Sequence, residues 1–176
     1  RRVAGEASIP QQRNPIQRVF LEPSEAPAYP WAVRAILEAD LIVVGPGSLY
    51  TSILPNLLVD GIAKAMRASR APKVYVCNVA TQPGETDGFS VQDHLHVLEE
   101  HIGRGAFSVV VANDSPPLLP PAAQSQPVHL ADQAPIPYRL VTADLVDPQN
   151  PWRHDPARLA ETLMSLYSEW KSEHIA

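Results

Sequence analysis

The chain has 176 residues and a formal net charge of −5, and its apolar fraction of 45% is ordinary for a globular protein. That length is enough for one domain with a hydrophobic core. Scattered Lys and Arg argue against a nucleic-acid binder, which needs a basic stripe. With Cys77 as the only cysteine, no internal disulfide can form. No apolar run approaches the roughly 20 residues of a membrane span.

No signal-peptide pattern opens the chain, so we expect a cytoplasmic protein. The first residues, Arg1-Arg2-Val3, carry no Met and resemble the middle of a domain. We therefore expect a truncated or proteolysed product.

Strand and helix patterns alternate along the first two thirds of the chain. The run Asp40–Val44 is almost continuously apolar, which is typical of a parallel strand covered on both faces. Ser90 and Asp93 resemble a capping box, and Gly103 is a suitable helix end. The alternation predicts a mainly parallel sheet with right-handed crossovers. Expected strands are 16–21, 40–44, 73–77 and 107–111; expected helices are 31–38, 55–69 and 91–102.

The last third of the chain has a different character. Seven prolines fall between Pro116 and Pro137, which predicts an irregular segment. Tyr138–Val141 is a candidate strand, and a final helix is expected with Asp155 as its cap and Pro156 at its first position. We expect a single α/β domain over 1–176, divided into a strand-helix core (1–114), a Pro-rich irregular segment (115–150) and a C-terminal helix (151–176).

Three polar segments follow the predicted strands, at Gly45–Ser52, Asn78–Ser90 and Asn113–Ser115. Parallel strands share a polarity, so these loops should emerge at one edge of the sheet. Open α/β sheets bind ligands outside that carboxyl edge. This convergence predicts a binding site there.

The first segment is suited to an anion. Gly45 and Gly47 permit backbone conformations that turn N–H groups toward a phosphate, and the following helix directs its positive end to the same place. It is not a Walker loop, because no Gly-Lys-Ser/Thr closes it. The alternative is a tight strand-to-helix turn with Thr51 or Ser52 as an ordinary N-cap.

The second segment and the C-terminal region offer further candidates. Glu85 and Asp87 could hold a metal ion or a ribose hydroxyl, or could be solvated turn residues. Arg153 could bind a phosphate in a bidentate manner, or could face solvent beside the capping residue Asp155.

Other reactive residue types carry weaker signals. The spacing of His94, His96 and His101 does not indicate zinc, so no metal site is expected. We expect Cys77 to be a core residue, and Ser48 has no visible base for a hydrolase triad.

Two longer motifs carry a family resemblance: GPGSLYTSILPNLL at 45–58 and VCNVATQPGETDGF at 76–89. With them the chain resembles the YvcK/CofD family along nearly its whole length. One branch of that family contains the phospholactate transferase that builds a deazaflavin coenzyme, and the other contains YvcK-like gluconeogenesis factors. The transferase branch has a shorter loop resembling GPSNP and lacks the TQPGETDG stretch, so this chain resembles the YvcK-like branch.

The resemblance implies a regulatory protein that binds a UDP-sugar and influences carbon use, cell-wall synthesis and cell shape. The alternative it implies is a 2-phospho-L-lactate transferase assisted by Mg²⁺; otherwise no cofactor is expected, and no catalytic residue is assigned. Motif chemistry and resemblance together give these expected ligand contacts: Gly45, Gly47, Ser48, Thr51, Ser52, Asn78, Thr81, Gln82, Gly84, Glu85, Thr86 and Arg153.

Three features depart from the family pattern. Relatives begin with a glycine-rich Rossmann-like loop that this sequence lacks, so the resemblance implies a three-layer Rossmann-like α/β sandwich whose sheet is incomplete. Its expected partners are the missing N-terminal half or a second copy. No Tyr lies between Asn113 and Pro137, where the family's UDP-sugar site has one, and Pro156 stands where some relatives carry a phosphorylatable Thr.

Overall fold

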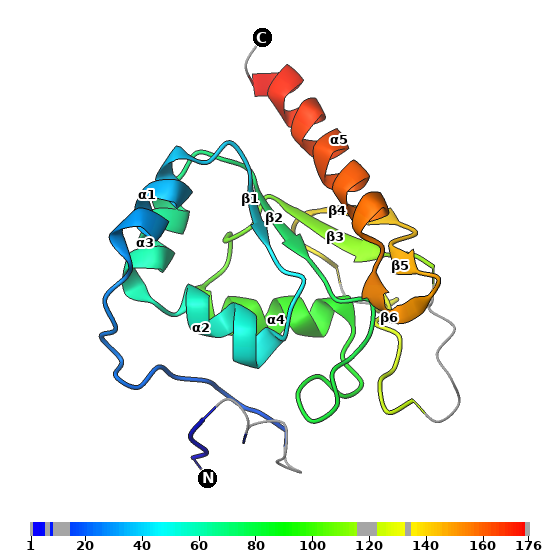
Figure 1. Cartoon of the computed structure of the whole chain (residues 1–176), viewed down its shortest axis with the longest axis horizontal. Helices are drawn as coiled ribbons and strands as arrows, with labels where there is room; N and C mark the ends of the chain where they lie inside the picture. Colours follow the sequence, from blue (N-terminus) through cyan, green and yellow to red (C-terminus); the bar gives the residue numbers. More distant parts are fainter. Residues whose placement is uncertain (1, 6–7, 9–14, 116–122, 133–134, 175–176) are drawn as a thin grey trace.

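Four parallel strands form the central sheet of the computed structural model, which describes residues 2–5, 8, 15–115, 123–132 and 135–174. Their order in the sheet follows the chain, with β1 at one edge and β4 at the other (Figure 1). Every neighbouring pair is parallel, which confirms the predicted sheet. The strands are β1 (Ile42–Val44), β2 (Lys73–Val76), β3 (Val109–Asn113) and β4 (Arg139–Ala143).

Helical segments lie between and after these strands. The capping box at Ser90 is confirmed, since its hydroxyl accepts from the Asp93 N–H while the Asp93 carboxylate accepts from the Ser90 N–H. Asp155 caps the last helix by accepting the N–H groups of Ala157 and Arg158. The helical segments are α1 (Pro30–Glu38), η2 (Leu49–Ile53), α2 (Leu54–Leu57), α3 (Asp60–Ala68), α4 (Val91–Ile102) and α5 (Pro156–His174).

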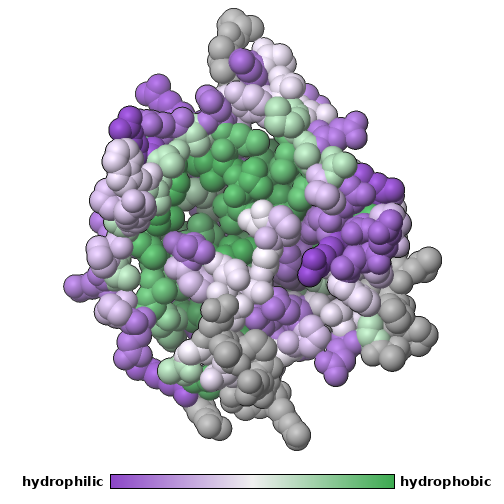
Figure 2. All heavy atoms as spheres, viewed as in Figure 1, coloured by the Kyte–Doolittle hydropathy of each residue, from purple (hydrophilic) through white to green (hydrophobic). Residues whose placement is uncertain are grey.

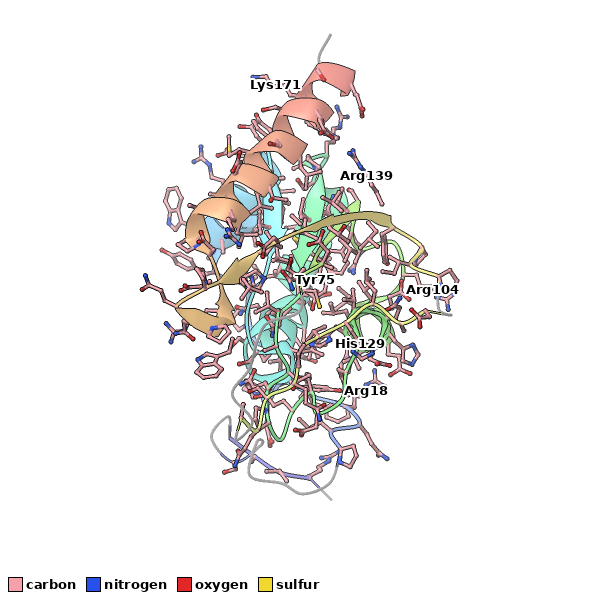
Figure 3. The ribbon with its side chains drawn as sticks, turned by 90° about the vertical axis from the view of Figure 1, so that its right-hand side faces the viewer. Arg18, Tyr75, Arg104, His129, Arg139 and Lys171 are labelled. Atoms are coloured by element: carbon pink, nitrogen blue, oxygen red, sulfur yellow. The ribbon has the colours of Figure 1, made fainter. Side chains whose placement is uncertain are left out.

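The two faces of the sheet carry separate apolar clusters, which makes three layers. On one face, Tyr75 and Val110 pack with Leu54 and Leu57 of the α2 region and with Leu98 of α4. On the other face, Val74, Val76, Val109 and Val111 pack with Leu145, Val146 and the α5 leucines 159, 163 and 166. In Figure 1, α2 and α4 lie on one side of the sheet and α5 on the other. Figure 3 shows Tyr75 in the interior, whereas Arg104 and Arg139 lie at the surface.

Two predicted elements are wrong. Residues 16–21 form no strand, and the segment instead lies against α4, where the Val19 N–H donates to His101 Nε2. The single helix expected at 55–69 is broken at Val59, whose extended backbone (φ −68°, ψ 114°) separates α2 from α3. The break allows Leu57 of α2 and Met66 of α3 to be buried from differently directed helices.

A hairpin of two short strands, β5 (Val146–Asp147) and β6 (Asn150–His154), precedes α5. The sequence predicts no strand here and places these residues in the irregular segment (115–150) and the C-terminal helix region (151–176). Among the described residues, none of the helices has the length and apolar character needed to cross a membrane.

Candidate functional site

The first loop leaves β1 at Gly45 and passes close to the end of β2. Gly45 has φ +87°, and a Cβ there would lie 2.6 Å from the Val76 carbonyl oxygen. Gly47 is different, because a Cβ there would meet only Ile53 and Ser52 side-chain atoms at 3.8 Å. Gly45 is therefore required by the fold, whereas a Cβ at Gly47 would make only ordinary van der Waals contacts.

Helical turns begin directly after this loop. The N–H groups of Ser52 and Ile53 both donate to the Ser48 carbonyl, at 2.9 Å. Ser48 occupies the N-cap position without a side-chain capping bond, so the expectation of Thr51 or Ser52 as N-cap is wrong. Thr51 instead donates its hydroxyl to Glu85 Oε1, at 2.9 Å.

Asn78, the first residue after β2 and Cys77, holds the first loop. Its Oδ1 accepts the Gly47 N–H at 3.1 Å, and its Nδ2 donates to the Gly47 carbonyl at 3.0 Å. This reciprocal pair joins the two loops at the carboxyl edge, as the sequence predicted that they would meet. The Asn78 amide thereby fixes the loop rather than simply lining it.

The rest of the second loop folds on itself around buried polar groups. Thr86 Oγ1 accepts the Gln82 N–H at 2.8 Å, and Gly84 donates its N–H to Asp87 Oδ2 at 2.7 Å. Glu85 is 4% exposed, with Gln82 Nε2 donating to its Oε1 at 3.3 Å. Glu85 therefore lies beneath the loops, and Asp87 closes a turn.

A segment that was missed by the sequence analysis supports the second loop. Thr81 exchanges two hydrogen bonds with Gln126, whose N–H donates to Thr81 Oγ1 and whose carbonyl accepts the Thr81 N–H. Val128 likewise donates its N–H to the Val79 carbonyl. No periodic sequence pattern marks residues 126–128, so their role in supporting the second loop is visible only from their tertiary contacts. We call this segment the 126–128 strap.

The third segment closes the same edge. Asn113 ends β3, and its Oδ1 accepts the Leu145 N–H at 2.9 Å, while its Nδ2 donates to the Ser115 carbonyl. Leu145 leads into the β5–β6 hairpin, so Asn113 links the end of β3 to that hairpin. Residues 116–122, part of the segment between Asn113 and Pro137 in which the sequence lacks the family Tyr, lie outside the described part of the chain.

The hairpin brings Arg153 to this edge of the sheet. His154, its neighbour in β6, donates from Nε2 to the Cys77 carbonyl at 3.1 Å, immediately before Asn78. Arg153 itself is exposed. The sequence signal for the hairpin is the two-residue connection Pro148-Gln149 between the paired residues Asp147 and Asn150.

The expected contacts thus divide into two sets. Thr81, Glu85 and Thr86 are 3%, 4% and 0% exposed and stabilise the loops from within. The other nine retain partial or full access to solvent: Gly45, Gly47, Ser48, Thr51, Ser52, Asn78, Gln82, Gly84 and Arg153. Only residues of the second set are accessible to a ligand that approaches this edge from solvent.

The remaining candidates lie apart from this edge or inside the core. Cys77 is fully buried, and burial raises the pKa of its thiol to about 12, which confirms the core assignment. Burial lowers the pKa of His94, whose Nδ1 donates to the Ser90 carbonyl. Within the described ranges, no three His, Cys, Asp or Glu side chains cluster as a metal site would require.

Two surface hollows lie away from the loops. One, of about 440 Å³, is bordered by Arg139 of β4 and by Arg158 and Glu169 of α5. The other, of about 190 Å³, lies between Met66 of α3 and Ile102 of α4. Neither includes a residue of the first or second loop.

The fold and these loops define an α/β protein whose polar loops converge outside the carboxyl ends of parallel strands, which is where open α/β sheets in general bind ligands. Residues 1–169 match the family described as 2-phospho-L-lactate transferase CofD. The chain belongs to this family.

Relatives and a solved structure agree. The chain is 41% identical over 176 residues to the gluconeogenesis factor of Listeria innocua, covering 97% of this chain and 55% of the relative. It is 49% identical over 111 residues to that of Bacillus subtilis, covering 63% and 35%. A crystal structure of a UPF0052-family protein from Bacillus halodurans superposes with a TM-score of 0.84 at 38% identity, over 92% of this chain and 55% of the other. The matched part therefore spans only 35% to 55% of the length of these relatives.

Proposed function

We propose that this protein is a YvcK-like regulatory protein that binds a phosphorylated nucleotide, with a UDP-sugar as the favoured ligand, at the carboxyl edge of the sheet. The observation that carries the proposal is the Gly47–Asn78 amide pair, which holds an open glycine loop in front of a first helical turn. Asn78 already accepts the Gly47 N–H, so the donors for an anion would be the other backbone N–H groups where the helical turns begin, a position that favours anions. The gluconeogenesis-factor names of the relatives support a role in carbon metabolism, and control of cell shape is part of the same proposal.

The direct test is a calorimetric titration of the natural full-length protein with UDP-glucose, with GDP as the comparison ligand. Gly47→Val should abolish binding and leave the fold nearly intact, because the Cβ at this position meets no atom closer than 3.8 Å. If the affinity of this variant is unchanged, the loop is only a structural turn and does not contact the ligand.

Arg153 is the proposed charged partner of the phosphate. A hydrogen bond to a charged group contributes about 1.5–3 kcal/mol, and each ~1.4 kcal/mol is tenfold. Arg153→Ala should therefore weaken UDP-glucose binding by about one to two decades, while Arg153→Lys recovers only part because Lys lacks the planar fork.

Arg34→Ala is the matched control, an exposed arginine on α1 that pairs with Glu38. Its affinity should equal that of the wild type. If Arg153→Ala changes the affinity for UDP-glucose by less than about twofold, well under the tenfold that ~1.4 kcal/mol represents, Arg153 is a solvated surface residue and not a ligand contact.

The second candidate function is phospholactate transfer, favoured by the description of the matched family. We expect no product from phospholactyl-guanosine diphosphate and the deazaflavin acceptor in the presence of Mg²⁺. The reason is the resemblance of the loops at 45–50 and 81–88 to the YvcK-like branch. Detectable product would favour the transferase instead.

An open apolar area suggests the remaining partner. Val43 is 39% exposed on the face of β1 opposite Ile42 and Val44, and Figure 2 shows a hydrophobic area around β1 and β2. Exposed apolar area and an unpaired strand edge both favour association. We propose that additional chain of the kind the longer relatives possess, or a second copy, covers it. Light scattering that finds the isolated 176 residues to be a monomer, together with a cooperative melt that UDP-glucose shifts upward, would contradict this.

A further inference from the structure

A histidine side chain joins the β5–β6 hairpin to the carboxyl edge of the sheet. His154 and Cys77 are 77 residues apart, and the contact joins a side-chain nitrogen to the last carbonyl before the second loop. β5 and β6 pair only with each other, in a sheet separate from β1–β4. The position of the hairpin therefore depends on this bond, on the buried residues Leu145 and Val146, and on the Asn113 contact described above.

The His154 contact continues into the first loop. Cys77 is followed by Asn78, whose amide group binds both the N–H and the carbonyl of Gly47. Three segments that are distant in sequence are thus joined in series: β6, the start of the second loop, and the glycine loop.

Strand geometry connects this series to Arg153. Successive side chains of a strand point to opposite faces. Because His154 is turned inward to the Cys77 carbonyl, its neighbour Arg153 is turned outward, and Arg153 is indeed exposed. Burial lowers the pKa of His154, so the ring is neutral at pH 7 and its Nε2 carries the donated hydrogen.

We infer that His154 is a positioning residue: its bond to the Cys77 carbonyl sets the place of Arg153 relative to the glycine loop, so that both reach one phosphorylated ligand. The inference rests on the proposed function, in which Arg153 and Gly47 border the same site. His154 acts through Arg153 and the loop and does not touch the ligand.

A double-mutant cycle in the full-length protein tests the coupling, with UDP-glucose as the calorimetric probe. His154→Leu removes the donor and should weaken binding about fivefold, the fold-change that corresponds to one neutral hydrogen bond. In an Arg153→Ala background the same change should have an effect below about twofold, because the residue being positioned is gone. His154→Gln, whose Nε2 can still donate, should restore most of the affinity.

Two further measurements separate positioning from general stability. His96→Leu, an exposed histidine on α4, is the matched control and should bind like the wild type. Melting temperatures of His154→Leu and His154→Gln should differ by no more than the roughly 2–4 °C that one hydrogen bond of about 1 kcal/mol represents in a chain of this size, while their affinities differ about fivefold. The inference would be overturned if the fold-changes in affinity of the two single variants multiplied fully in the double variant, or if His154→Gln bound UDP-glucose no better than His154→Leu.

A ligand-free measurement keeps this result distinct from failure of the proposed function. The Gly47 amide is held by Asn78, so its hydrogen exchange, followed by NMR, should accelerate in His154→Leu and remain unchanged in His96→Leu. No heat from wild-type protein with UDP-glucose would reject the proposed function. An unchanged hydrogen-exchange rate of the Gly47 amide in His154→Leu would show that the His154 bond does not position the glycine loop, whether or not the wild type binds UDP-glucose.

Discussion

Gly45→Ala should destabilise the protein strongly, and Gly47→Ala, two residues away, should not. At Gly45 the new Cβ meets the Val76 carbonyl oxygen at 2.6 Å, with φ at +87°. A residue with a Cβ in the left-handed region costs about 1–2 kcal/mol, and overpacking adds about 1–3 kcal/mol. The sum of about 2–5 kcal/mol corresponds to a drop in Tm of roughly 4–20 °C for a chain of this size.

Thermal unfolding followed by circular dichroism measures the difference. Gly47→Ala is the matched control, because its Cβ lies 3.8 Å from Ile53 Cγ1 and from Ser52 Cβ, which is ordinary van der Waals contact. Its change in free energy of unfolding should stay within about 0.5 kcal/mol. Equal melting temperatures for the two alanine variants would refute the assignment of separate roles to the two glycines.

Three other changes test separate parts of the structure. Burial lowers the pKa of His94 below its usual 6.5, so the unfolded chain binds a proton more readily and the free energy of unfolding should fall as the pH drops below about 6.5. In thermal melts at pH 7.5 and 5.5, His94→Gln should reduce this loss of stability, whereas exposed His96→Gln should not. A loss of stability that is as large in His94→Gln as in the wild type would contradict this. Ser90→Ala removes the cap of α4 and should cost about 0.5–2 kcal/mol of unfolding free energy in urea; Ser172→Ala, near the end of α5, should be neutral. Thr51→Val removes a donor to buried Glu85 and should cost about 1–3 kcal/mol, whereas an unchanged urea midpoint would show that the bond contributes nothing.

The parallel sheet could be predicted because its strands are buried on both faces. β3 is buried at all five positions, and its run of valine and alanine gives the continuous apolar pattern that such burial produces. The α4 helix could be predicted equally well, since a capping box and a terminal glycine mark its two ends in the sequence. The segment at 16–21 has similar apolar residues but lies beside α4 without a neighbouring strand, and strand propensity alone does not supply a partner.

Long-range contacts explain what the sequence could not give for the site. That the loops meet follows from strand polarity, but the Asn78–Gly47 amide pair and the Gln126–Thr81 strap join residues 31 and 45 positions apart. Asn78 and Thr81 were expected beside the ligand, and their side chains are engaged by backbone groups of the protein. Short polar side chains carry the same sequence signal whether they bind a ligand or hold a loop.

The arrangement of the loops and the open apolar face have a common origin in the sheet. Gly45 leaves β1, the edge strand, so the glycine loop lies at the margin of the four-stranded sheet rather than at its centre. Ligand sites in open α/β sheets lie where strand order reverses, with a strand on each side of the crevice. On the β2 side, Asn78 and the hairpin provide that wall. Beyond β1, no described strand pairs with the sheet, and Val43 is exposed on one face of this edge strand. A segment that pairs with the free edge of β1 would lie beside both Val43 and the glycine loop, so association at this edge and ligand affinity should be coupled.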